Sequence, residues 1–269
     1  ARLETAVAEI LASKAFDNGL APSAEQCVIV DGCVEPRVRR AFQDRGGYFM
    51  SPEEADAVIA VLFHADGRRR RHMVGQSAQA LAQKAGFVPP QDTRVLLAPR
   101  LYVAGADPYT RELLTPVLGY YVEPDWRHAC EKCLELLLQE RHAQTLTIHS
   151  QDAEVIRQFA LKKPVARLLV NTGAAFGGMG LTTNLTPAMT QGSGIAGYGI
   201  TSDNISPYNL IYRRTVGYGV RGLDCLADFA APQSANPAPP TQEDPLELLR
   251  AVLRRALETA PAPRGRTRP

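Results

Sequence analysis

The sequence from Lys14 to Val30 reads KAFDNGLAPSAEQCVIV, and it contains a helix end, a short loop and the start of a strand. Apolar residues recur at three- and four-residue spacing from Leu3 to Ala15, which predicts a helix with one buried face. Asn18-Gly19 tolerates the left-handed backbone conformation that ends helices. The apolar run from Cys27 to Val30 predicts a buried strand. We expect this arrangement to hold one side chain at a helix end, facing a cleft.

The composition is that of an ordinary globular chain. Its 269 residues are 45% hydrophobic and 22% charged, enough for one large domain or two modest ones. The formal net charge of +2 is too balanced to indicate a nucleic acid or a membrane surface as partner, and no apolar run is long enough for a spanning helix. Five cysteines without framework spacing predict reduced thiols and a cytoplasmic location. The chain opens inside a helical pattern without Met, so we expect a fragment or the second half of a larger protein.

Strand and helix patterns alternate after the opening stretch. Gly46-Gly47 is expected to end a second helix, and Ser51-Pro52 to begin a third as N-cap and first helical residue. Further strands are predicted at residues 93–98, after Pro116, and at 145–149 and 165–170, with helices at 77–85, 125–138 and 151–161. This alternation predicts an α/β fold of three layers with a mostly parallel sheet.

The last quarter of the chain has a different composition. Residues 209–220 predict a β-strand or hairpin arm, exposed enough to pair with another subunit. A Pro- and Ala-rich linker follows, then an amphipathic helix at 245–257 and a Pro- and Arg-rich tail. The predicted divisions are a main domain, an oligomerisation β-arm, a linker, the amphipathic helix and a disordered tail, at residues 1–206, 207–222, 223–243, 244–258 and 259–269.

Residues 16–26 resemble the nucleophile loop of the CoA-acylating aldehyde dehydrogenases, which reads roughly Phe-Asp-Asn-Gly-x-x-Cys-Ala-x-Glu-Gln. With the two ends of the loop aligned, the catalytic cysteine of that family falls on Pro22. The resemblance covers roughly residues 1–222, the catalytic half of the family fold. Residues 201–211, TSDNISPYNLI, look like the branch that acts on short aldehydes inside bacterial microcompartments.

The resemblance implies an oxidoreductase that converts a short aldehyde and CoA to acyl-CoA with NAD. In that reaction a cysteine thiolate attacks the aldehyde, hydride leaves to the nicotinamide and CoA takes the acyl group. Proline offers no nucleophile, and the family's cofactor half is not in this sequence. We therefore expect no catalytic residue at Pro22 and no activity from this chain alone. Cys27 is a weak alternative nucleophile; the other interpretation is a small buried core residue.

Glu112 lies in the segment RELLTPVL, residues 111–118, which looks like the aldehyde dehydrogenase segment Glu-x-x-x-Pro-Val-Leu. In that superfamily the glutamate binds the ribose next to the nicotinamide, so the resemblance makes Glu112 a cofactor-binding residue. The alternative is an ordinary glutamate at a helix start. Cys130-x-x-Cys133 and His149 are interpreted as structural, and no metal site is expected. The glycine-rich residues 173–199 are a weak dinucleotide fingerprint.

The sequence therefore favours a partial acylating aldehyde dehydrogenase. The alternative is a non-catalytic assembly subunit that pairs through residues 209–220 with its own kind or with a full-length dehydrogenase. Residues 245–257 look like the encapsulation peptides that bind microcompartment shell proteins. They would place the chain in a microcompartment lumen.

Overall fold

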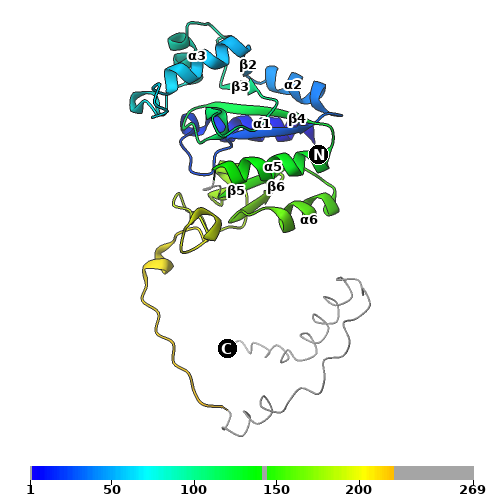
Figure 1. Ribbon diagram of the computed structural model, residues 1–269. Helices are drawn as coiled ribbons and strands as arrows, with labels where there is room; N and C mark the ends of the chain where they lie inside the picture. The colour runs from blue at the N-terminus through cyan, green and yellow to red at the C-terminus, as the bar shows by residue number, and fades with distance from the viewer. Residues whose placement is uncertain (1, 141–143, 221–269) are drawn as a thin grey trace, which may run out of the picture. The chain divides into compact units, whose positions relative to one another are not determined.

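The structure is a computed structural model that describes residues 2–140 and 144–220 (Figure 1). Residues up to Tyr212 belong to one compact unit, and those from Arg213 onward to a second. Of the second unit, residues 213–220 are described, and they contain neither helix nor strand. No helix in the described ranges is both long and apolar enough to cross a membrane.

The first part of the main unit builds a four-stranded parallel sheet in the order β1-β4-β3-β2. In register, Cys27 of β1 lies opposite Gly119 of β4, and Leu97 of β3 lies opposite Leu118 of β4. The elements in chain order are α1 (Leu3–Ala15), β1 (Cys27–Asp31), α2 (Glu35–Gln43), β2 (Gly47–Phe49), α3 (Pro52–Leu62), α4 (Ala78–Ala85), β3 (Val95–Pro99) and β4 (Val117–Glu123).

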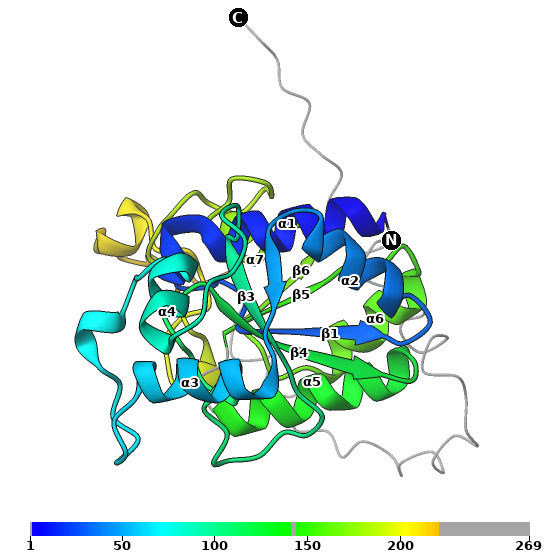
Figure 2. The ribbon, with the colours of Figure 1, turned by 90° about the horizontal axis from the view of Figure 1, so that it is seen from above.

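The second part adds a separate two-stranded parallel sheet, β5-β6, with Thr145 opposite Arg167. Its elements are α5 (Trp126–Glu140), β5 (Thr145–Ile148), α6 (Ala153–Lys162), β6 (Arg167–Val170) and the short α7 (Ala174–Gly178). Figure 2 shows α1 and α2 on one side of the strands and α3 and α5 on the other. The predicted α/β fold with three layers and parallel strands is therefore confirmed.

Local signals account for the helix ends. The Ser51 hydroxyl accepts the Glu54 amide at 3.2 Å, and the Glu54 carboxylate accepts the Ser51 amide at 2.8 Å, so α3 begins with a complete capping box. Asp152 caps α6 by accepting from the amides of Glu154 and Val155. Gly86, with a φ of +89°, ends α4.

The core lies on both faces of the four-stranded sheet. One face of the sheet packs against α1 and α2 through buried residues that include Val7, Leu11, Val28, Phe42 and Leu97. The other face packs against α3 and α4 through Val58, Leu62, Leu81, Leu96 and Val117. Because helices cover both faces, nearly every residue of β3 is apolar and buried.

Three expectations from the sequence differ from the structure. The parallel strands form two sheets among the described residues, instead of one. Residues 47–49 form β2, whereas the glycine pair was expected only to end a helix; a three-residue strand is too short to leave a periodic pattern. Residues 209–220 were expected to be a strand.

That prediction of a strand is wrong for the single chain. Asn209 and Leu210 end a 3-10 helix, Pro207–Leu210, and residues 211–220 have no regular structure. The physical reason is that a β-strand needs a paired neighbour, and residues 211–220 pair with no strand in the described structure. Pairing with another subunit stays a prediction. The predicted linker and the helix at 245–257 lie outside the described residues.

Candidate functional site

The loop after α1 has an unusual backbone. Asp17, Asn18 and Gly19 all adopt left-handed conformations, with φ of 47°, 49° and 78°. A Cβ on Gly19 would lie 2.4 Å from the Thr115 carbonyl oxygen, so no other residue fits there without a shift. The Asn18 side chain donates to the Gly75 carbonyl at 2.9 Å. The predicted tight loop is confirmed, and two distant segments hold it in place.

Pro22 lies at the tip of this loop and is exposed. The Ala24 amide donates to the Ala21 carbonyl at 2.9 Å, which makes residues 21–24 a β-turn with Pro22 in its second position. Proline is favoured there because its φ is preset. Next to it, the Ser23 hydroxyl donates to the Ala174 carbonyl at 3.0 Å. The position that resembles the family nucleophile is therefore a rigid turn without a reactive group.

The carboxylate of Glu25 holds the loop in place through hydrogen bonds. Glu25 accepts the Ser13 hydroxyl at 2.6 Å and the Ala174 amide at 2.7 Å, and the Ser13 oxygen in turn accepts the Ala175 amide at 2.8 Å. Burial raises the pKa of Glu25. This network joins α1, the loop and the start of α7.

Lys14 is fully buried beneath the same loop. Its ammonium donates to the Gln26 side-chain oxygen at 3.3 Å, and that oxygen also accepts the Leu113 amide at 3.2 Å. Burial lowers the pKa of Lys14 to about 8, partly offset by the nearby charge of Glu25. Sequence reasoning did not single out Lys14 or Glu25. The available signal was a polar side chain at each end of a short loop between two buried elements.

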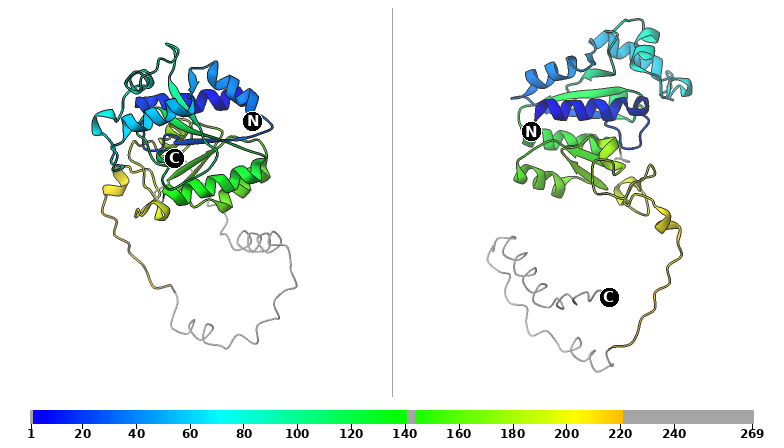
Figure 3. Two further views of the ribbon diagram at one scale, coloured as in Figure 1. Left: turned by 45° about the horizontal axis from the view of Figure 1, so that its top comes forward. Right: turned by 180° about the vertical axis from the view of Figure 1, so that it is seen from behind.

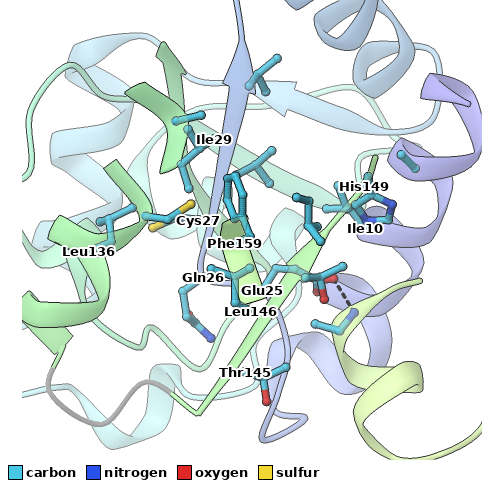
Figure 4. Close-up of a pocket in the computed structure, with 18 of the residues that line it drawn as sticks. Ile10, Glu25, Gln26, Cys27, Ile29, Leu136, Thr145, Leu146, His149 and Phe159 are labelled. Carbon is cyan, nitrogen blue, oxygen red and sulfur yellow. Dashed lines mark hydrogen bonds between the residues drawn. The ribbon is translucent and has the colours of Figure 1, made fainter. Parts of the chain in front are cut away.

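A cavity of about 890 Å³ lies beside β1, and the loop forms part of its wall (Figure 4). Pro22, Cys27 and Glu112 all line it, although they come from a turn, a strand and a segment near residue 110. The structure therefore brings together the three candidate site residues that the sequence singled out.

Cys27 lies at the start of β1 and is half-buried. Its thiol donates to the Tyr109 carbonyl at 3.6 Å and lies so close to Gly119 that a Cβ there would be 3.1 Å from the sulfur. Burial raises the pKa of the Cys27 thiol to about 12. Because the thiolate is the nucleophile, a thiol with this pKa is unreactive near neutral pH.

Glu112 is half-buried, and its carbonyl accepts a hydrogen bond from Arg69. Its carboxylate has no hydrogen bond or ion pair within the described residues. A free carboxylate at a cavity wall can accept hydrogen bonds from vicinal hydroxyls, which is the chemistry that a ribose requires. Its position is compatible with the ribose-binding role that the resemblance implies, and that role stays a prediction.

The start of the glycine-rich region has no free backbone amide for a phosphate at the first two residues of α7. Gly173 precedes α7, where a nucleotide phosphate would need free backbone amides. The Glu25 carboxylate and the Ser13 hydroxyl already accept the amides of Ala174 and Ala175. A Cβ on Gly173 would lie 2.8 Å from the Glu9 carbonyl oxygen, so this glycine permits close packing of α7 against α1.

The remaining candidates belong to no cluster of potential metal ligands in the described residues, although Cys133 and His149 line the cavity. Cys130 and Cys133 lie in α5 and pack with Ile148 and Phe159, and burial raises the pKa of the Cys133 thiol to about 12. Burial lowers the pKa of His149 to about 4. The described ranges contain no group of three or more potential metal-binding side chains.

The three-layer fold and the helix-loop-strand segment are those of the catalytic domain of an aldehyde dehydrogenase. No protein-family model matches the sequence. Over 221 residues, 80% of this chain and 25% of the relative, the sequence is 36% identical to the bifunctional aldehyde-alcohol dehydrogenase AdhE of Escherichia coli. It is 28% identical over 213 residues to an acetylating succinate-semialdehyde dehydrogenase of Clostridium kluyveri, covering 79% of this chain and 47% of that one.

The structure is also similar to solved enzymes. A probable aldehyde dehydrogenase from Listeria monocytogenes superposes with a TM-score of 0.79 at 43% identity, covering 84% of this chain and 50% of that chain. The resemblance to the CoA-acylating aldehyde dehydrogenases that the sequence predicted is confirmed, and it covers about 80% of this chain and only a part of those proteins. The chain spans about half the length of the Listeria enzyme and a quarter of the E. coli one.

Proposed function

We propose that this chain supplies part of the framework of an acylating aldehyde dehydrogenase site without itself oxidising aldehydes. The observation that carries the proposal is Pro22, which lies in the second position of a hydrogen-bonded turn where the family places its cysteine. The nearest other thiol in the sequence, Cys27, is half-buried and its pKa is raised.

The family reaction requires a thiol at this position. A thiolate adds to the aldehyde carbonyl, and hydride leaves that carbon for NAD⁺. The thioester then passes its acyl group to the sulfur of CoA, so aldehyde, CoA and NAD⁺ give acyl-CoA, NADH and a proton. Pro22 has neither a thiol nor a hydroxyl, so the first carbon–sulfur bond cannot form there. Because burial raises the pKa of Cys27, its thiol stays protonated near neutral pH.

The cofactors of this proposal are NAD and CoA. Glu112 would hold the ribose next to the nicotinamide through its carboxylate. NAD supplies the hydride acceptor when it is bound. The loop around Pro22 and the wall of the cavity would shape the aldehyde end of the site.

The test is a coupled measurement of NADH formation. Purified chain is mixed with acetaldehyde or propionaldehyde, CoA and NAD⁺, beside a full-length acetylating dehydrogenase as positive control. We expect no CoA-dependent NADH above background, because loss of a covalent nucleophile costs several orders of magnitude in rate. CoA-dependent NADH that disappears in Cys27→Ser would overturn the proposal and make Cys27 the nucleophile.

An assembly role is the second candidate. Tyr212, Val216 and Tyr218 are 84%, 69% and 85% exposed. Several exposed apolar side chains in one short segment favour contact with another subunit. The C-terminal segment extends this candidate to a microcompartment shell protein. Its test is a fluorescent protein fused to residues 232–269 in cells that express a shell. Punctate fluorescence that becomes diffuse with Leu249→Glu supports targeting, and diffuse fluorescence from both forms contradicts it.

A further inference from the structure

The cavity beside β1 has the walls that normally surround a central strand of a three-layer fold. Two of its sides are the strands β1 and β5, which line it along their whole length. A third side is α1, through Leu3, Ala6, Val7 and Ile10, and the fourth is α5, through Ala129, Cys133 and Leu136. Figure 1 shows α5 in front of the strands, and the view from behind in Figure 3 shows α1 on the opposite side. The space between β1 and β5 therefore lies in the sheet layer.

The edge of β1 that faces the cavity carries unpaired backbone groups. In the described residues, β1 pairs with β4 alone. The Gly119 amide donates to the Gln26 carbonyl, with Cys27 opposite Gly119 in register. In a parallel ladder this pattern directs the amides and carbonyls of Val28 and Val30 to β4. Those of Cys27, Ile29 and Asp31 point the other way, into the cavity.

The edge of β5 that faces the cavity also carries unpaired backbone groups. The Arg167 amide donates to the Gln144 carbonyl, and the Asn171 amide donates to the Ile148 carbonyl. Even-numbered residues of β5 therefore bond to β6, and the backbone groups of Thr145, Thr147 and His149 face the cavity. The Thr147 hydroxyl and the His149 Nε2 are also buried without a hydrogen-bond partner in the described structure. Buried polar groups without partners are rare in a finished fold.

The two edges run in the same direction. β4 is parallel to β1, and the chain passes from β4 through α5, which packs on β1 and β4, to β5. A strand-helix-strand crossover of this kind places β5 parallel to β4 and therefore to β1. One strand parallel to both would complete the two ladders.

We propose that the cavity receives a single parallel β-strand from the part of the aldehyde dehydrogenase fold that this chain does not span, joining β1 and β5 into one continuous sheet. The chain covers 50% of the Listeria enzyme, so that enzyme carries as much sequence again. With helices α1 and α5 on both faces, the inserted strand should be a near-continuous run of about five apolar residues. The proposal does not depend on Pro22 or on whether the chain oxidises aldehydes.

An apolar small molecule is the main alternative occupant, because 890 Å³ is within the usual range of ligand pockets. A small molecule, however, leaves alternate amides on two separate edges without partners. A strand would pair the free backbone groups of both β1 and β5, so the hydrogen-bond pattern favours a strand over a ligand.

Hydrogen exchange of the full chain, resolved by residue, tests the open edges. We expect the amides of Ile29 and Thr147 to exchange at least tenfold faster than those of Val28 and Ile148, their neighbours in the existing ladders. Equal protection in the chain alone would mean that the two edges are already closed, which overturns the proposal. Protection that grows with chain concentration would identify a second copy as the occupant and would also overturn it.

The second step adds the amino-terminal half of the Listeria enzyme as a separate polypeptide. We expect the two to co-purify and the amides of both Ile29 and Thr147 to become protected together. Binding without protection at these amides, or no binding, contradicts the proposal. Failure here leaves the aldehyde assay above unaffected, so the two proposals can fail separately.

Proline substitutions test the cavity-facing edge of a strand without removing the hydrogen bonds on its other edge. Ile29→Pro removes an amide that faces the cavity and leaves the Val28 and Val30 bonds to β4, as edge strands tolerate. We expect it to weaken binding of the added half more than tenfold. Ile29→Val is the matched control that keeps the amide. Thr147→Pro is the second variant, and the melting temperature of each free chain shows that it is folded. Unchanged binding by both folded proline variants would overturn the proposal.

Discussion

The Glu25 carboxylate accepts the Ala174 amide at 2.7 Å, across 149 residues of sequence. This contact places a negative charge at the first turn of α7 and ties that helix to the loop that carries Pro22. It also occupies the Ala174 amide, and the Ser13 hydroxyl occupies the Ala175 amide, so neither donor is free for a phosphate. The Glu25 carboxylate thus holds the loop in place, while Pro22 at its tip lines the cavity without a polar side chain.

Gly19→Ala should destabilise the chain strongly. The substitution places a Cβ 2.4 Å from the Thr115 carbonyl oxygen at a φ of +78°, so both sterics and backbone conformation oppose it. We expect a loss of about 2–4 kcal/mol in the free energy of unfolding, measured by urea titration. Gly86→Ala is the matched control: its φ is +89° but no atom lies within 4 Å of the added Cβ, so about 1 kcal/mol is expected. Equal losses would show that the Thr115 contact is relieved by movement.

Lys14→Met should change the pH dependence of stability. The pKa of Lys14 is lowered from 10.5 to about 8, so between these pH values the unfolded chain binds a proton that the folded chain does not. The free energy of unfolding of the parent should therefore rise with pH in this window, by at most about 1.4 kcal/mol per pH unit. Below pH 8 both states are protonated and the burial penalty is present in full.

The methionine variant should lack this rise and should be no less stable than the parent at pH 7, because it removes a buried charge at similar volume. Urea unfolding at pH 7, 8 and 9 measures both effects. Lys84→Met, on the exposed side of α4, is the control and should keep the parent slope. The raised pKa values of the Cys27 and Cys133 thiols oppose this slope equally in both proteins, so the difference between parent and variant is the test. A difference that does not change between pH 8 and 9 contradicts the assignment.

Pro22→Cys should fold. The second position of a β-turn accepts most residues, and the Ala24-to-Ala21 hydrogen bond does not involve the Pro22 nitrogen. Loss of the rigid ring should lower the free energy of unfolding by about 0.4–1 kcal/mol. The introduced thiol, at an exposed turn, should react with a thiol reagent much faster than the half-buried Cys27, whose pKa is raised. Slow labelling at this position would mean that the turn is covered.

Glu112→Ala should remove whatever affinity the chain has for NAD. One ribose contact without the rest of a dinucleotide site supports binding no tighter than about 1 mM. Isothermal titration with NAD⁺ is the measurement, and Glu154→Ala, an exposed carboxylate on α6, is the control. Micromolar binding that Glu112→Ala abolishes would show that this half of the fold holds the cofactor by itself.

Val216→Lys should reduce association if residues 209–220 pair with another subunit. Val216 is 69% exposed, so the charge should not disturb the single chain. Light scattering at several protein concentrations should then give a smaller mass than the parent. An unchanged mass would exclude this segment as the contact.

The sequence by itself determined most of the local structure and the family. Periodic apolar residues predicted the helices and most of the strands, Ser51 and Asp152 predicted helix starts, and the loop at residues 16–26 identified the resemblance. These signals act over a few residues, because helix caps, turn preferences and side-chain periodicity depend on neighbours in the chain. The absence of a cysteine at Pro22 was also readable directly.

Only the tertiary structure decided which distant groups meet. It placed Pro22 and Glu112 on one cavity, buried Lys14 under the loop and brought Glu25 to the start of α7. It also separated β1 from β5, although both segments had been recognised as strands. Burial, pKa shifts and the order of strands in a parallel sheet depend on contacts between segments far apart in sequence. A local sequence pattern does not predict these contacts.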